Sequence, residues 1–199
     1  MSPLVIALWW NYDGGLMGKL IYKMGGVSAD GYIVGPDGSF DWGVPDEELH
    51  RFHNDEARAL SGHLLGRRLY ETMLYWEAPV ADDSEIQRDF QSIWQAVPKV
   101  VFSRTLEAVE GTNMKLALRD LPTELAALQA HGDVGIGGAG LAAEAIRLGL
   151  VDEFQLLVYP VSVGGGIPYF PRDCRLDLEL VESRTFSSKV VYTRYRLRR

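Results

Sequence analysis

The residues of this sequence best suited to bind an anion form a glycine cluster, residues 137–140, between an apolar segment and a helical stretch. The apolar segment covers residues 133–136, and the helical stretch ends near Gly149. Glycines let a backbone approach a ligand closely, and the free N–H groups and the dipole of a helix start attract phosphate. The cluster therefore predicts a site for a phosphorylated ligand, with a tight turn that binds nothing as the alternative.

Two further places carry cations directly after an apolar segment. Arg67 and Arg68 follow Gly66 where a helix is expected to begin, and Ser103 and Arg104 close another apolar segment. Cations at a helix start oppose the helix dipole, so a phosphate, which the forked arginine side chain recognises, would explain them. Solvent-facing arginines and an ordinary loop remain the alternatives.

These three segments can form one site only if the fold brings the ends of their strands together. Apolar and turn patterns predict strands at residues 19–27, 62–66, 98–104, 113–118, 133–137 and 153–160. Between them, helices are predicted to start near residues 46, 67, 84, 121 and 139, and a hairpin to span residues 175–197. The alternation predicts an α/β fold with a mostly parallel sheet and a C-terminal antiparallel hairpin. Ligands of such sheets bind at the carboxyl ends of the strands, so we expect a basic, glycine-lined groove for a ligand of nucleotide size.

Composition and charge argue against several classes of protein. The chain has 199 residues and a net charge of −7, which argues against general nucleic-acid or anionic-membrane binding. No apolar run is long enough to span a bilayer, and the lone Cys174 fits a reducing cytoplasm. His50 and His53 favour a solvated helix face over a metal site, so no metal is predicted.

The chain is predicted to form one domain, residues 18–199, after an N-terminal extension, residues 1–17. An added edge strand or a partner-binding tail is the alternative for the extension.

Gly135, Gly137 and Gly140 also match the G-x-G-x-x-G pattern of Rossmann dinucleotide-binding folds. The pattern occurs late in the chain, and no acidic residue stands about 20 residues further on, as that fold requires. A P-loop sequence is absent as well. Both of these nucleotide-binding classes are therefore disfavoured.

Several short motifs together resemble a known family, the dihydrofolate reductase-like proteins of the riboflavin-biosynthesis reductase (RibD C-terminal domain) type. The matching pieces are residues 27–33, 65–71, 100–104, 137–140 with 149–153, and Pro160 with 164–170. The resemblance covers about residues 18–198 and implies a three-layer fold, NADPH as cofactor and a homodimer.

The resemblance also implies which residues meet NADPH. In chain order they are Val34, Gly66, Arg67, Arg68, Ser103, Arg104, Gly137, Gly138, Ala139, Gly140 and Leu141. The arginines and Ser103 would hold the adenosine 2′-phosphate side, and residues 137–141 would bind the pyrophosphate, with an unusual peptide geometry at Gly137–Gly138. The loop of residues 28–35 would lie beside the nicotinamide.

Reduction of a C=N or C=O bond also needs a proton, and Asp30 is the acid best placed by sequence. Nearby aromatic residues could raise the pKa of its carboxyl group; a purely structural role in an Asp-Gly turn is the alternative. Trp42, Tyr70 and Trp76 are candidate substrate walls, or else core residues.

The function implied is an NADPH-dependent reductase of a small pterin-, flavin- or aminopyrimidine-like substrate, similar to 5-amino-6-(5-phosphoribosylamino)uracil reductase. The chain lacks the zinc signature of a fused deaminase, which puts a role in riboflavin synthesis in doubt. The alternative is a dimeric protein of the same fold that binds a nucleotide or small molecule without turnover.

Overall fold

The computed structural model describes residues 17–79 and 84–198. The extension predicted for residues 1–17 lies outside the described residues, apart from Met17. From Gly18 onward the chain is attached to the fold. The Gly18 N–H donates to the Gln129 carbonyl at 3.0 Å, and the Gln129 side chain donates back to the Gly18 carbonyl at 2.7 Å.

The centre of the fold is a mixed sheet in the order β10-β11-β8-β1-β7-β4-β5-β6, with β2 pairing beside β1 on β8. All neighbours from β8 to β6 are parallel, whereas β11 runs antiparallel to both β8 and β10. The strands are β1 (Leu20–Lys23), β2 (Val27–Ser28), β4 (Gly62–Gly66), β5 (Lys99–Phe102), β6 (Met114–Leu116), β7 (Val134–Gly137), β8 (Glu153–Tyr159), β10 (Leu178–Thr185) and β11 (Val191–Leu197). The predicted parallel sheet with a C-terminal antiparallel hairpin is confirmed.

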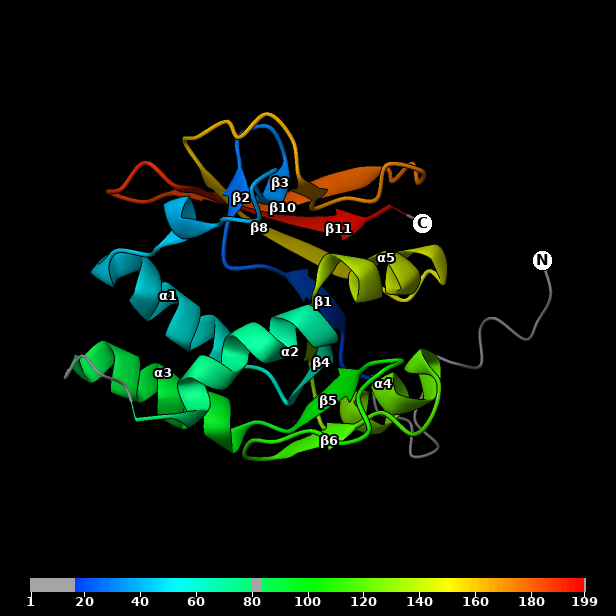
Figure 1. Cartoon of the computed structure of the whole chain (residues 1–199). Coiled ribbons are helices and arrows are strands. Elements are labelled where there is room, and N and C mark those ends of the chain that lie inside the picture. The colour runs from blue at the N-terminus through cyan, green and yellow to red at the C-terminus, as the bar shows by residue number, and fades with distance from the viewer. Residues whose placement is uncertain (1–16, 80–83, 199) are drawn as a thin grey trace.

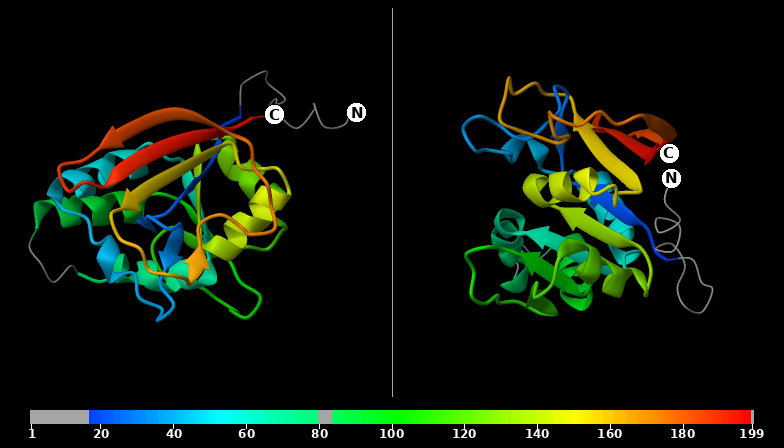
Figure 2. Two further views of the ribbon diagram at one scale, coloured as in Figure 1. Left: turned by 90° about the horizontal axis from the view of Figure 1, so that it is seen from above. Right: turned by 90° about the vertical axis from the view of Figure 1, so that its right-hand side faces the viewer.

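Helices cover both faces of this sheet (Figures 1 and 2). One face packs on α4 (Leu121–Gln129) and α5 (Ala139–Arg147) through a continuous apolar core. The other face packs on α1 (Glu47–Arg58), α2 (Arg67–Met73) and α3 (Glu85–Ala96). This is the predicted three-layer arrangement. None of the helices in the described part of the chain is long and apolar enough to cross a membrane.

Short elements complete the fold. Two 3₁₀ helices follow the first long loop and α2, namely η2 (Asp41–Gly43) and η3 (Leu74–Glu77). A separate two-stranded sheet pairs β3 (Tyr32–Val34) with β9 (Ile167–Pro168). It joins the loop after β2 to the loop after β8, so these two loops form one unit above the ends of those strands.

The strand predicted for residues 19–27 is interrupted. Residues 24–26 leave the sheet between β1 and β2, although both strands pair with β8 in the same direction. At Gly26 the backbone passes the rings of Tyr159 and Trp42, and an added β-carbon would lie 3.0 Å from Tyr159. The break places Met24 beside the end of β7 rather than in the ladder.

Two glycines of the G-x-G-x-x-G match are explained by packing within β7. A β-carbon at Gly135 would lie 2.7 Å from Nδ1 of His63, and one at Gly137 would lie 2.2 Å from a methyl of Leu69. Both positions face the α1–α3 side of the sheet, where the neighbouring side chains fill the space. For Gly135 and Gly137 the match to the Rossmann pattern therefore has a cause in the packing of β7.

We expect Gly135→Ala to lower the free energy of unfolding by about 1–3 kcal/mol, because the new methyl group overfills the space beside His63. Gly140→Ala is the matched control. A β-carbon there would meet no protein atom within 4 Å, and alanine favours the helix by up to about 1 kcal/mol. Chemical denaturation measures both. Equal stability of the two variants would contradict the packing explanation.

Candidate functional site

The three predicted anion-binding places are neighbours at one edge of the sheet. β7, β4 and β5 are adjacent and parallel, with Leu65 opposite Gly137 and Gly66 opposite Phe102. The segments that follow these strands therefore leave the sheet side by side. Met24, which follows β1, reaches the same edge, because its sulfur lies 3.5 Å from the amide nitrogen of Gly138.

The glycine turn presents unpaired backbone donors. Ala142 is the first residue of α5 whose N–H bonds to a carbonyl of the turn, that of Gly138, at 2.9 Å. The amides of residues 139–141 have no partner among the described residues and are thus available to a ligand. Gly138 has φ +94°, which favours glycine, and the described residues contain no cis peptide, so the unusual geometry of the turn is this φ angle. Gly140 is exposed, and its missing side chain leaves open space.

Three arginines follow the strands β4 and β5, and only one of them is hydrogen-bonded to other described residues through its side chain. Arg67 donates to Glu71 on its own helix and to the Thr105 hydroxyl, both at 2.7 Å, so it ties the start of α2 to the loop after β5. Arg68 and Arg104 are exposed, and their side chains make no hydrogen bond or ion pair with the described residues. These two arginines are the free cations at the edge.

The remaining predicted cofactor residues have structural partners. The Ser103 hydroxyl accepts from the N–H groups of Thr105 and Leu106 at 3.1 and 3.0 Å and so shapes the loop that carries Arg104. Leu141 is buried in the core under Gly66. Val34 lies in β3, opposite Ile167 of β9.

Asp30 joins two loops. Its carboxylate accepts from the hydroxyls of Ser28 and Ser162 at 2.6 and 3.0 Å and from the N–H groups of Val163 and Gly164 at 3.1 and 2.7 Å. These bonds, that from Ser28 above all, hold the pKa of Asp30 well below its usual value. The expectation that aromatic neighbours raise this pKa is wrong. A carboxylate held as an anion does not serve as a proton donor near neutral pH.

The predicted aromatic walls are largely core residues. Tyr70 is buried, and its hydroxyl accepts from the Glu110 N–H at 2.9 Å. Trp76 packs edge-on against Phe90 with ring centroids 4.7 Å apart. Trp42 instead lines a surface hollow, which it shares with Pro36 and other residues of the loop after β3. Tyr70 and Trp76 therefore take the alternative role of core packing.

A small cavity beneath α1 was not predicted from the sequence. It lies against β1, β8 and β11 and is lined by Lys23, Met24, Phe52, His53, Glu56, Gln155, Leu157 and Tyr192. The signals available in the sequence were a lysine closing an apolar strand and the spacing of three between His53 and Glu56, which puts both on one face of a helix.

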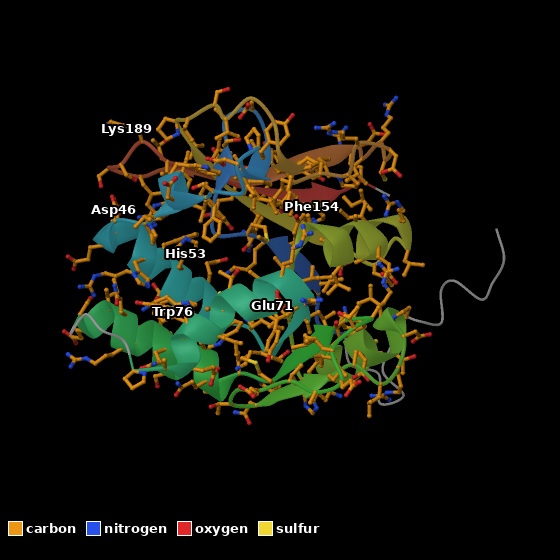
Figure 3. All side chains as sticks on the ribbon, viewed as in Figure 1. Asp46, His53, Glu71, Trp76, Phe154 and Lys189 are labelled. Atoms are coloured by element: carbon orange, nitrogen blue, oxygen red, sulfur yellow. The ribbon has the colours of Figure 1, made fainter. Side chains whose placement is uncertain are left out.

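The cavity changes the interpretation of the two histidines of α1. His50 packs against Trp76 at 6.1 Å between ring centroids, and His53 faces the cavity, so neither lies on a solvated helix face (Figure 3). Burial lowers the pKa of His53 to about 3 and that of Lys23 to about 8. Among residues 17–79 and 84–198, no three His, Cys, Asp or Glu side chains are arranged to hold a metal ion.

Comparisons with known proteins agree with this architecture. The model of the RibD C-terminal domain family matches residues 19–192. The uncharacterized protein YyaP of Bacillus subtilis is 32% identical over 174 residues, which cover 85% of this chain and 90% of YyaP.

Solved structures show the same fold at lower identity. A protein assigned to riboflavin biosynthesis from Shewanella sp. PV-4 has a TM-score of 0.71 at 21% identity, covering 92% of this chain and 100% of its own. Dihydrofolate reductase from Enterococcus faecalis, complexed with NADP(H), has a TM-score of 0.58 at 16% identity, covering 92% and 98%. The fold is thus of the dihydrofolate reductase type, and the chain belongs to the RibD C-terminal domain family.

Proposed function

We propose that this protein is an NADPH-dependent reductase that transfers hydride to a small heterocycle of the pterin, flavin or aminopyrimidine kind. One observation carries the proposal. The glycine turn, with its unpaired amides, lies beside two strand ends that present the free cations Arg68 and Arg104. Such an edge suits a ligand with a pyrophosphate and a separate phosphate.

The residues present fit the cofactor. The amides of residues 139–141 would bind the pyrophosphate, and the open space at Gly140 lets it approach the backbone. Arg68 and Arg104 would bind the adenosine 2′-phosphate, while Arg67 and Ser103 position their loops. When bound, the cofactor supplies the hydride. The NADP(H) complex of the Enterococcus reductase, which shares the fold, supports this choice of cofactor.

The hydride acceptor would lie near the end of β1, between the glycine turn and the unit formed by β3 and β9. Gly66 and Val34 would flank the cofactor at the two ends of this region, as the family resemblance suggests. Trp42 remains a candidate wall for the substrate, because it lines a hollow open to solvent. Pairing into a homodimer belongs to the same proposal.

A binder without turnover is a second candidate. The observation that favours it is the state of Asp30, the acid expected from the sequence, which is held as an anion by four hydrogen bonds. A reductase of this chain must take its proton from another group. A binder would need none, and would show cofactor affinity with no substrate reduced.

We expect Arg68→Ala combined with Arg104→Ala to weaken NADPH binding by at least about tenfold, because each guanidinium loses a charge-assisted bond to the 2′-phosphate. NADH lacks that phosphate, so its weaker binding should change little. Fluorescence titration of both cofactors gives the comparison. Arg175→Ala is the control, since Arg175 is exposed and pairs with Asp177 at 3.0 Å. An equal loss for NADPH and NADH would contradict the assignment.

We expect Asp30→Asn to raise the KM of the substrate and to leave the pH profile of kcat unchanged. The amide cannot accept all four hydrogen bonds, so the loop of residues 162–164 loses its attachment while the proton donor stays in place. Steady-state kinetics across pH tests this. Loss of the alkaline limb of the profile would instead make Asp30 the acid.

A further inference from the structure

The cavity beneath α1 is small, and polar side chains share its lining with apolar ones. It lies between α1 and the sheet, with Lys23 from β1, His53 and Glu56 from α1, Gln155 from β8 and Tyr192 from β11 in its wall (Figure 3 labels His53). Its volume of about 10 Å³ admits the centre of one water molecule.

The polar side chains around this cavity make no hydrogen bonds with the described residues. Gln155 and Tyr192 are 7% and 2% exposed, yet the Gln155 amide and the Tyr192 hydroxyl make no hydrogen bond within the described residues. The same holds for the side chains of Lys23, His53 and Glu56. Their polar atoms are not among the fully buried atoms that lack a partner, so they remain accessible to a water molecule in the cavity. A molecule that both donates and accepts hydrogen bonds satisfies this mixed set.

The cavity adjoins the edge that the proposed function uses. Lys23 is the last residue of β1, and Met24 lines the cavity while its sulfur contacts the amide of Gly138 in the glycine turn. Lys23, His53 and Glu56 are each partly exposed. The five polar groups thus share one cavity with the end of β1, the strand end near which the hydride acceptor is proposed to lie.

We propose that the cavity binds one ordered water, held by Gln155, Tyr192 and Glu56, which returns protons to Lys23 during the reduction. The role of Lys23 in catalysis rests on the proposed function, whereas the presence of the water rests on the cavity alone. The carbon of the substrate C=N or C=O bond receives the hydride, and the π electron pair moves to nitrogen or oxygen. That atom takes a proton from the Lys23 ammonium. The water gives a proton to the amine left behind and takes one from solvent past Glu56, so that Lys23 and the water both return to their starting forms.

The charges around Lys23 suit this role. The titratable groups that face it are Glu56 and His53 from α1, His63 from β4 and Tyr192 from β11. Burial lowers the pKa of both histidines to about 3 and raises that of Tyr192, so these three stay neutral near pH 7. Glu56 opposes the effect of burial on Lys23, whose pKa stands at about 8. Lys23 can therefore give up and regain a proton close to neutral pH.

The water is tested first, without any substrate. A high-resolution crystal structure should show one ordered water within hydrogen-bonding distance of Gln155 and Tyr192, and Tyr192→Phe should remove it or lower its occupancy. An empty cavity in the wild-type crystal would overturn the proposal whatever the enzyme reduces.

The relay is tested by Glu56→Gln. Without the carboxylate, the pKa of Lys23, followed by NMR of its side chain, should fall by about one unit. The alkaline limb of kcat should shift by the same amount, with NADPH affinity unchanged. Glu47→Gln is the matched control, because Glu47 is exposed on the same helix and pairs with Arg51 at 2.6 Å. An unchanged Lys23 pKa in Glu56→Gln would overturn the relay.

Lys23→Met separates this inference from the proposed function. We expect kcat to fall by about 10²-fold or more, as for loss of a proton donor, with cofactor affinity retained. Full activity of this variant would refute the relay and leave the reductase standing. No reduction by the wild type of any heterocycle would refute the reductase, while the crystal and NMR results would still decide on the water and on the coupling of Glu56 to Lys23.

Discussion

The arrangement depends on β7 running through the middle of the parallel sheet with no side chains on one of its faces. Gly135 and Gly137 leave room for His63 and Leu69, which belong to β4 and α2. This close packing holds β7 next to β4 in a fixed register. Because the strands are parallel, the same register fixes where their carboxyl ends stand. The glycine turn after β7 therefore opens directly beside the arginine-bearing start of α2.

The residues at this edge of the sheet have two different roles. Some fix the loops through hydrogen bonds, and others have side chains available to a ligand. Arg67 and Ser103 use their polar atoms within the protein and so fix the loops after β4 and β5. Arg68 and Arg104 carry charge with no partner in the described part of the chain. Asp30 joins the loops after β2 and β8 through its hydrogen bonds, just as Arg67 joins the start of α2 to the loop after β5. The hydrogen-bonded side chains thus hold the loops in place, while Arg68 and Arg104 stay available to bind a ligand.

Sequence patterns predicted the elements well because apolar periodicity reports directly on a three-layer α/β fold. They failed where contacts between distant segments decide. Asp30 looked like an acid beside aromatic residues, but its partners Ser162 and Gly164 lie more than 130 positions away and keep it ionised. Tyr70 and Trp76 lie in the same stretch as the arginines, and only their packing with Trp94 of α3 and Val101 of β5 in one apolar cluster shows that they face the core. Residues close in the sequence therefore do not reveal the pKa of Asp30 or the orientation of Tyr70 and Trp76.

The sequence by itself determined the fold class, the three strand ends with their glycines and cations, and, through short motifs in order, the family. These features are local, because each depends on residue types within a few positions. Tertiary structure decided which arginines are free, that Asp30 joins loops, and that Lys23, His53, Glu56, Gln155 and Tyr192 share one cavity. Those residues come from four separate elements, and a cavity exists only where the packing of such elements leaves a space. Burial, which sets the pKa of Lys23, likewise arises only when α1 covers the sheet.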